Sequence, residues 1–217
     1  MNYKGIIFDL DGTLDDTLED IAGSVNHVLE LHGYPVHPIN HYKLLVGRGL
    51  DNLVKQALPE TARETDIVSV LLAEMIAYYD AHCLVKTHLY EGIYDVITRL
   101  SAMNIKLAVF SNKAEPLTVK IVDYLLGNIS FVKVAGARPD VPKKPDPAGV
   151  LDISRIMGIK PDWLLYAGDS DVDMMTANRA GITALGVSWG FRSKEELQSN
   201  GADFILDHPQ EILPFFQ

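Results

Sequence analysis

The stretch Lys4-Gly-Ile-Ile-Phe-Asp-Leu-Asp-Gly-Thr13 indicates the fold of this chain. It contains a short apolar run, without alternating polar residues, that stops at Asp9. Such runs are typical of strands buried on both faces of a parallel sheet. The two aspartates that follow also suit a turn or a helix cap, so their role depends on the rest of the chain.

The same pattern recurs along the chain. Apolar runs cover residues 105–110, 131–135, 163–167 and 182–187. Helical patterns cover residues 93–103, 117–126, 148–157 and 172–180. This strand–helix–strand repetition predicts an α/β fold with a doubly wound parallel sheet.

Residues 17–83 interrupt that repetition. Apolar residues recur at helical spacing from Ile21 to Leu29, and segments 50–58 and 67–79 repeat the helical pattern without a clear strand. We therefore predict an all-helical cap domain inserted after the first strand, with the core formed by residues 1–16 and 84–217. An insert at that point lies over the carboxyl ends of the strands, where open α/β sheets bind ligands.

Charge and composition exclude several classes of partner. The formal net charge of −10 repels polyanions, so we expect no nucleic-acid partner. The apolar segment 67–79 is too short to cross a bilayer, so we expect no membrane partner. Cys83 is the only cysteine, which excludes an intrachain disulfide, and the N-terminus lacks the pattern of a secretory signal. We expect a cytoplasmic protein; the sequence predicts no particular oligomeric state.

Four short polar segments follow predicted strands or open predicted helices. They are residues 9–13, 111–113, 143–147 and 168–173. Because the carboxyl ends of parallel strands meet at one crevice, Asp9, Asp11 and Asp169 should crowd a small volume, and Asp173 follows four residues later. Placing carboxylates so close together costs free energy unless a proton or a cation lies between them. The arrangement predicts a bound Mg²⁺, which prefers oxygen ligands.

With these motifs the sequence resembles the haloacid dehalogenase superfamily of phosphatases, and within it the phosphoglycolate phosphatase group. The matching features are Asp9-x-Asp-Gly-Thr-Leu-x-Asp-Thr17, Val46-Gly-Arg-Gly-Leu50, Tyr90-x-Gly92, Leu107-Ala-Val-x-Ser-Asn-Lys113 and Lys144-Pro-x-Pro147. The resemblance covers essentially the whole chain and implies a Rossmann-like core with a helical cap, residues 17–83. Asp15 stands where this group usually has an apolar or small residue, and we expect the extra carboxylate to perturb cap closure.

The resemblance also implies a mechanism. Asp9 attacks phosphorus and becomes an aspartyl phosphate. Asp11 protonates the leaving alkoxide and later deprotonates the attacking water. Asp9, the backbone carbonyl of Asp11 and Asp169 bind Mg²⁺, while Asp173 orients Lys144 or a metal-bound water.

Substrate contacts follow from the same resemblance. The implied binding residues are Gly12, Thr13, Arg48, Ser111, Asn112 and Lys144. Of these, Ser111, the Asn112 amide and Lys144 also offset charge in the transition state. Arg48 lies between two glycines and suits a substrate carboxylate or phosphate, although a surface arginine in an interhelical loop is the alternative. Lys143 is adjacent to Lys144, but the family lysine directly precedes Pro-x-Pro. Lys113 is interpreted as a solvated residue that opens a helix.

The predicted function is magnesium-dependent hydrolysis of a small anionic phosphorylated metabolite, with 2-phosphoglycolate as the first candidate. One alternative is phosphoryl transfer within a sugar phosphate, as in beta-phosphoglucomutase. A second is a non-catalytic binding protein on the same scaffold. Dehalogenation is disfavoured because displacement of a halide does not need the acid–base group that Asp11 supplies.

Overall fold

The structure is a computed structural model that describes residues 3–217. Its centre is a parallel sheet with strand order β5-β4-β1-β6-β7-β8. The strands are β1 (Gly5–Phe8), β4 (Lys106–Ala114), β5 (Lys133–Ala137), β6 (Leu164–Gly168), β7 (Thr183–Val187) and β8 (Phe204–Leu206). Because β1 pairs with both β4 and β6, the chain leaves the middle of the sheet at Asp9.

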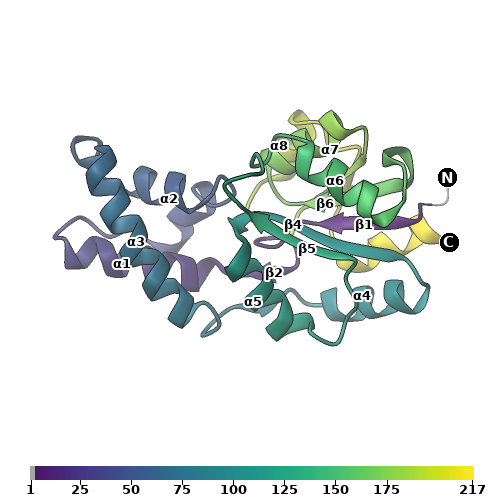
Figure 1. The fold of residues 1–217 in the computed structure, drawn as a ribbon, viewed down its shortest axis with the longest axis horizontal. Coiled ribbons are helices and arrows are strands. Elements are labelled where there is room, and N and C mark those ends of the chain that lie inside the picture. Colours follow the sequence, from purple (N-terminus) through teal and green to yellow (C-terminus); the bar gives the residue numbers. More distant parts are fainter. Residues whose placement is uncertain (1–2) are drawn as a thin grey trace.

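Helices cover both faces of this sheet (Figure 1). One face carries α4 (Ile93–Ala102) and α5 (Glu115–Leu126). The other carries α6 (Ala148–Met157), α7 (Asp171–Ala180) and α8 (Lys194–Ser199). A 3₁₀ segment, Pro209–Phe216, packs beside α4. The predicted fold class is therefore confirmed. Within residues 3–217, every helix is too short or too polar to cross a membrane.

Burial on both faces explains the continuous apolar runs. Along β1, Ile6 and Phe8 point into one hydrophobic cluster, whereas Ile7 points into the other. Strand side chains alternate between faces, so a strand covered by helices on both sides needs apolar residues at every position.

The cap helices lie beyond one end of the sheet, at the opposite end of the molecule from the two marked ends of the chain (Figure 1). They are α1 (Leu18–Leu31), α2 (Leu50–Ala57) and α3 (Thr65–His82), with short 3₁₀ turns at Ile39–Leu44 and Glu60–Ala62. The two connections pair as an antiparallel ribbon, β2 (Asp15–Asp16) with β3 (His88–Leu89). The predicted domain boundaries at 16/17 and 83/84 lie beside this ribbon and stay a prediction.

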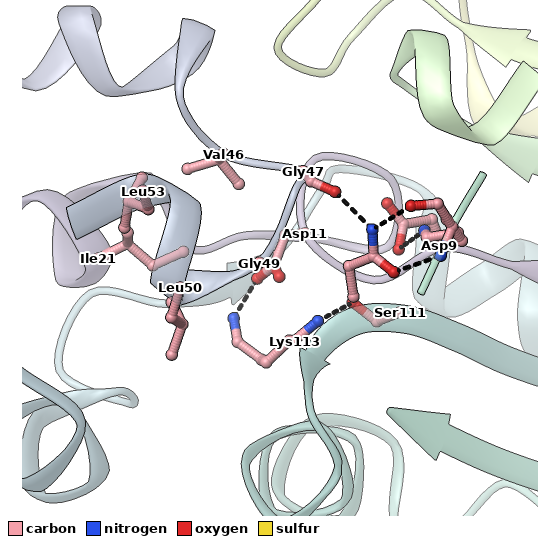
Figure 2. A pocket seen from close by; sticks show the side chains of 12 residues that line it. Asp9, Asp11, Ile21, Val46, Gly47, Gly49, Leu50, Leu53, Ser111 and Lys113 are labelled. Atoms are coloured by element: carbon pink, nitrogen blue, oxygen red, sulfur yellow. Dashed lines mark hydrogen bonds and ion pairs between the residues drawn. The ribbon is translucent and has the colours of Figure 1, made fainter. Parts of the chain in front are cut away.

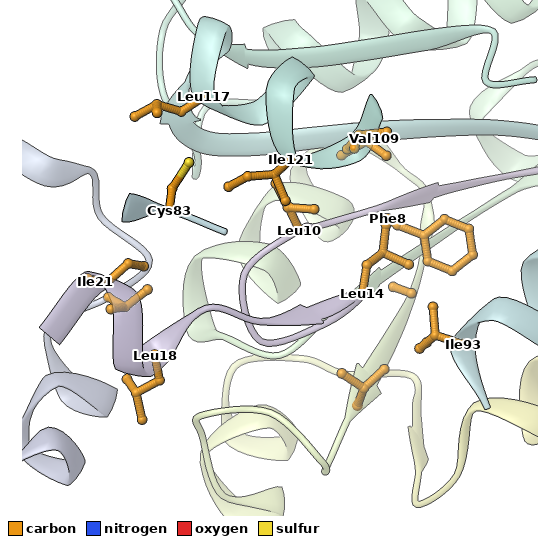
Figure 3. Packing of buried hydrophobic residues seen from close by; sticks show 14 of the residues in the cluster. Phe8, Leu10, Leu14, Leu18, Ile21, Cys83, Ile93, Val109, Leu117 and Ile121 are labelled. Carbon is orange, nitrogen blue, oxygen red and sulfur yellow. The ribbon is translucent and has the colours of Figure 1, made fainter. Parts of the chain in front are cut away.

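Asp20, in the first turn of α1, joins this helix to the connection that returns to the core. Its Oδ2 accepts hydrogen bonds from the backbone N–H groups of Val85, Lys86 and Thr87 at 3.1, 2.9 and 2.8 Å. Apolar packing continues across the same junction: Leu14, Leu18 and Ile21 belong to one cluster with Cys83 and the core helix residues Leu117 and Ile121 (Figure 3). The cap and the core therefore share a hydrophobic core at the junction.

The structure contains more regular structure than the sequence predicts, including α8 and the ribbon of β2 and β3. Strand β4 continues to Ala114, past the predicted end at 110, with an irregularity in its pairing to β5 between Phe110 and Ala114. Strand β8 and the C-terminal 3₁₀ segment were not predicted. With three residues at the sheet edge, β8 is too short to show a clear periodicity.

Candidate active site

The turn after β1 brings Asp9 beside the end of β6. The Asp9 N–H donates to Ala167 O at 2.9 Å, and both Asp9 and Asp11 are buried. Gly12 has φ +86°, and a Cβ at this position would lie 2.2 Å from Asp169 Oδ2. Only glycine combines the left-handed backbone with this close approach, so the Gly12 turn places Asp169 next to the first motif.

Asp9, Asp169 and Asp173 form a buried acidic cluster. Each offers a carboxylate oxygen, and these oxygens lie within 4.8 Å of one another. Burial, followed by the charge of Asp173, raises the pKa of Asp9 to about 7. Burial and the charges of Asp173 and Asp9 likewise raise the pKa of Asp169 well above its usual range. Such excess negative charge fits a divalent cation with oxygen ligands.

Asp173 is the member of this cluster whose oxygens are already engaged. Its Oδ1 accepts from Lys144 Nζ at 2.7 Å and from Tyr166 OH at 3.2 Å. Its Oδ2 accepts from the N–H of Ser170 at 3.1 Å and from the Ser170 hydroxyl. These contacts fit the predicted role of orienting Lys144. Among the described residues Asp169, by contrast, accepts one hydrogen bond, from Phe191 N–H to Oδ2 at 2.7 Å.

Lys144 is buried between two carboxylates. Its Nζ lies 2.7 Å from both Asp9 Oδ1 and Asp173 Oδ1, although only the Asp173 contact has hydrogen-bond alignment. Burial alone would lower the pKa of this ammonium, but the charges of Asp173 and Asp9 raise it well above its usual range. Lys143 is exposed and pairs instead with Asp51 of the cap at 2.6 Å. Of the two adjacent lysines, only Lys144 reaches Asp9.

Strand β4 carries Ser111 and Asn112 into the same pocket. The Asn112 side chain donates to Gly47 O at 2.9 Å and to Lys144 O at 3.1 Å, and it accepts from Lys144 N–H at 2.8 Å. This amide therefore connects the cap loop to the backbone of Lys144.

The interpretation of Lys113 as a solvated residue is wrong. Lys113 is buried, and its ammonium forms an ion pair with Asp11 Oδ1. Thr17 Oγ1 donates to the same oxygen at 2.6 Å. Because β4 continues to Ala114, Lys113 lies within the strand and not at the start of a helix. The sequence reading missed it because it ended this strand at residue 110.

The pocket has a polar wall from the core and a largely apolar wall from the cap (Figure 2). The core wall is formed by Asp9, Asp11, Ser111, Asn112, Lys113 and Lys144. The cap wall is formed by Ile21, Val46, Gly47, Gly49, Leu50 and Leu53. The structure therefore brings six predicted or adjacent motif residues to one pocket.

Arg48 does not line this pocket. Its side chain is 51% exposed and pairs with Asp171 at the start of α7. Thr13 is buried beneath the site, where its carbonyl accepts from Trp189 Nε1 at 3.0 Å. Substrate contacts by Arg48, Gly12 and Thr13 stay predictions.

Arg192 is a positioning residue that no sequence signal indicated. This buried side chain donates to the carbonyls of Leu44 and Val46 at 3.3 and 2.9 Å, and also to that of Lys43. It therefore holds the cap segment that leads into the Gly47–Gly49 loop. The contact joins residues nearly 150 positions apart, which is why local patterns do not show it.

Asp15 lies fully buried in β2 next to this site. Neither carboxylate oxygen has a hydrogen-bond partner among the described residues. Burial, and then the charge of Asp11, raise the pKa of Asp15 well above its usual range, although Lys113 opposes this. The predicted effect of this residue on cap closure stays untested.

Comparison with known proteins agrees with this geometry. The sequence profile described as haloacid dehalogenase-like hydrolase matches residues 6–187. A phosphoglycolate phosphatase from Pseudomonas putida is 30% identical over 215 residues, covering 96% of this chain and 78% of that protein. One from Aquifex aeolicus is 33% identical over 208 residues, covering 96% and 94%. The crystal structure of a predicted phosphoglycolate phosphatase from Haemophilus somnus has a TM-score of 0.91 at 26% identity, covering 100% of this chain and 99% of that one. The chain therefore belongs to the haloacid dehalogenase-like hydrolases, as a phosphatase similar to the phosphoglycolate phosphatases.

Proposed function

We propose that this phosphatase hydrolyses a small anionic phosphate monoester through an aspartyl phosphate on Asp9, with Mg²⁺ as cofactor. The observation that carries the proposal is the position of Asp9. Its carboxylate lies in one buried pocket with the ammonium of Lys144, next to Asp169 and Asp11.

In the first half of the reaction, an oxygen of Asp9 forms a bond to phosphorus as the bond to the leaving oxygen breaks. Asp11 gives its proton to that leaving oxygen. Ser111, Asn112 and Lys144 line the pocket around Asp9, where they offset the negative charge of the phosphoryl oxygens.

In the second half, water attacks the phosphorus of the aspartyl phosphate. Asp11, now ionised, takes a proton from this water, and the bond between Asp9 and phosphorus breaks to release inorganic phosphate. The buried pocket beneath the cap wall limits access of other water molecules.

The acidic cluster fits a divalent cation. Asp9 and Asp169 would hold it together with the backbone carbonyl of Asp11, because the oxygens of Asp173 already accept from Lys144, Tyr166 and Ser170. When bound, such a cation offsets the charge of the carboxylates and of the phosphoryl group.

We infer that 2-phosphoglycolate is the first substrate to test, because the curated relatives named above are phosphoglycolate phosphatases. Phosphoryl transfer within a sugar is distinguished by its product, since it yields an isomeric hexose phosphate and no free phosphate.

The test compares phosphate release by the wild-type enzyme and by Asp9→Asn, with 2-phosphoglycolate and with a generic aryl phosphate. We expect Mg²⁺-dependent release that EDTA abolishes, and a loss of at least ~1,000-fold in kcat for Asp9→Asn, because an amide is not an effective nucleophile. Asp152→Asn, an exposed carboxylate on α6, is the control and should keep full activity. Undiminished activity of Asp9→Asn would refute the nucleophile assignment.

A further inference from the structure

We propose that Lys113 is a positioning residue for Asp11: with Thr17 it holds one carboxylate oxygen of Asp11, so that the other oxygen faces the substrate to exchange the proton. This inference rests on the proposed function, in which Asp11 is the acid and base.

The first observation is that two donors meet at one atom. The ammonium of Lys113 and the hydroxyl of Thr17, the latter at 2.6 Å, both contact Asp11 Oδ1. In the part of the chain that the structure describes, both hydrogen bonds to this carboxylate end on Oδ1. Asp11 Oδ2 is left to the pocket that Asp11 lines.

The second observation is that Lys113 is held rigidly at this place. Its side chain is 1% exposed, and its backbone N–H donates to Ser111 Oγ at 3.2 Å. Its ammonium lies 5.1 Å from the centre of the Tyr79 ring, within the range of a cation–π contact. A buried ammonium is costly without a partner, so the pair with Asp11 is required and the arrangement resists rearrangement.

The third observation concerns torsional freedom. An aspartate carboxylate rotates over a broad range about its last bond, because that torsion has no steep staggered minima. Two donors on Oδ1 restrict this rotation and select one orientation. Proton transfer demands such a fixed geometry, within hydrogen-bond reach of the leaving oxygen.

A competing role for Lys113 is direct binding of a carboxylate on the substrate. Lys113 and Lys144 are the two cationic side chains that line the pocket, whereas Arg48 lies outside it. The two roles make different predictions for substrates with and without a carboxylate, and for substrates whose leaving group needs no proton.

The experiment measures kcat/KM of the wild type, Lys113→Met and Thr17→Val with three compounds: p-nitrophenyl phosphate, ethyl phosphate and 2-phosphoglycolate. This ratio reports steps up to formation of the aspartyl phosphate, so the later use of Asp11 as a base does not enter. p-Nitrophenolate leaves without a proton, whereas both alkoxides need one.

For Lys113→Met we expect a loss of ~10²-fold or more with both alkyl phosphates, against a few-fold with p-nitrophenyl phosphate. Thr17→Val should show the same selectivity with a smaller loss, and Thr17→Ser should restore the alkyl phosphates because it keeps the hydroxyl. Lys120→Met is the matched control, since Lys120 is also a core lysine that pairs with an aspartate, Asp80 at 2.9 Å, but on the surface. It should change none of the ratios between substrates.

Equal losses with all three substrates would overturn the proposal and assign Lys113 a structural role. A loss confined to 2-phosphoglycolate would overturn it in favour of carboxylate binding. If Lys113→Met does not fold, Thr17→Val tests the same oxygen without removing a buried charge, and an unselective result there also overturns the proposal. Failure of the wild type to release phosphate from any of the three would instead refute the proposed function.

Discussion

Single side chains in this protein carry charge where water is excluded. Asp15 is the clearest example, because its two oxygens are buried without a hydrogen-bond partner among the described residues. Because Lys113 forms its ion pair with Asp11, it offsets the charge of Asp15 only from a distance. An unpartnered carboxylate of this kind costs stability unless it is protonated.

The pKa of Asp15, raised by burial, sets the direction of a pH effect. A carboxyl whose pKa is higher in the folded state keeps a proton that the unfolded chain has lost. Its contribution to stability therefore becomes more unfavourable as pH rises above the unfolded value of about 4. Asp15→Asn should raise the free energy of unfolding by about 1–3 kcal/mol at pH 8 and by little near pH 4.

Denaturant unfolding at the two pH values checks this prediction. Asp16→Asn is the matched control: the neighbouring carboxylate is half-buried and accepts from the N–H of Leu18 at 3.1 Å. It should give no gain. A destabilised Asp15→Asn at pH 8 would mean that Asp15 has a favourable partner in solution.

At the scale of elements, the loop between the Ile39–Leu44 turn and α2 matters most, since it supplies Gly47, Gly49 and Val46 to the pocket wall. Two core side chains donate hydrogen bonds to its backbone carbonyls, and the core residue Asp171 pairs with its Arg48. Asn112 donates to the carbonyl of Gly47, and Arg192 donates to that of Val46 at 2.9 Å. The position of this wall therefore depends on strand β4 and on the segment after β7.

Arg192→Met should loosen this loop, because it leaves three carbonyls without their charged donor, each such hydrogen bond being worth about 1.5–3 kcal/mol. We expect faster amide hydrogen exchange in residues 43–50 and unchanged exchange in α6. Arg63→Met is the control, since Arg63 also donates to backbone carbonyls, but within the cap, at Leu58 and Gln56. Unchanged exchange in residues 43–50 of Arg192→Met would contradict the assigned role.

At the scale of the whole molecule, buried carboxylates link stability to pH and to metal. The pKa of Asp9 is raised to about 7 by burial and by Asp173, and burial also raises that of Asp169. The metal-free protein should therefore lose stability as pH rises from about 4 to above 7, the window between the unfolded and folded values. A divalent cation replaces protons at these oxygens, so its binding strengthens over the same window.

Thermal unfolding with and without Mg²⁺ tests this linkage. We expect Tm to fall between pH 5 and pH 8 without metal. The increase in Tm on adding Mg²⁺ should be larger at pH 8 than at pH 6. At a hundredfold excess of Mg²⁺ over Kd, binding raises the free energy of unfolding by about 2.7 kcal/mol. Asp169→Asn should lose most of this increment. An increment independent of pH would show that the ion binds elsewhere.

The layered α/β fold and the order of the site residues follow from local patterns in the sequence. A strand formed by a continuous apolar run, such as residues 4–8, buries both of its faces only when helices cover both sides of the sheet. The aspartates that follow such strands then meet at the edge where the carboxyl ends of the strands lie. Lys144 could likewise be distinguished from Lys143 by the motif, and only Lys144 reaches Asp9.

The directions of the long side chains, in contrast, are set by contacts that form only on folding. It turned Arg48 toward Asp171, buried Lys113 against Asp11, and joined Arg192 to a segment almost 150 residues away. The physical reason is that the local periodicity of apolar residues shows which face of an element is buried. A charged side chain instead points toward partners that lie far along the chain and become its neighbours only on folding.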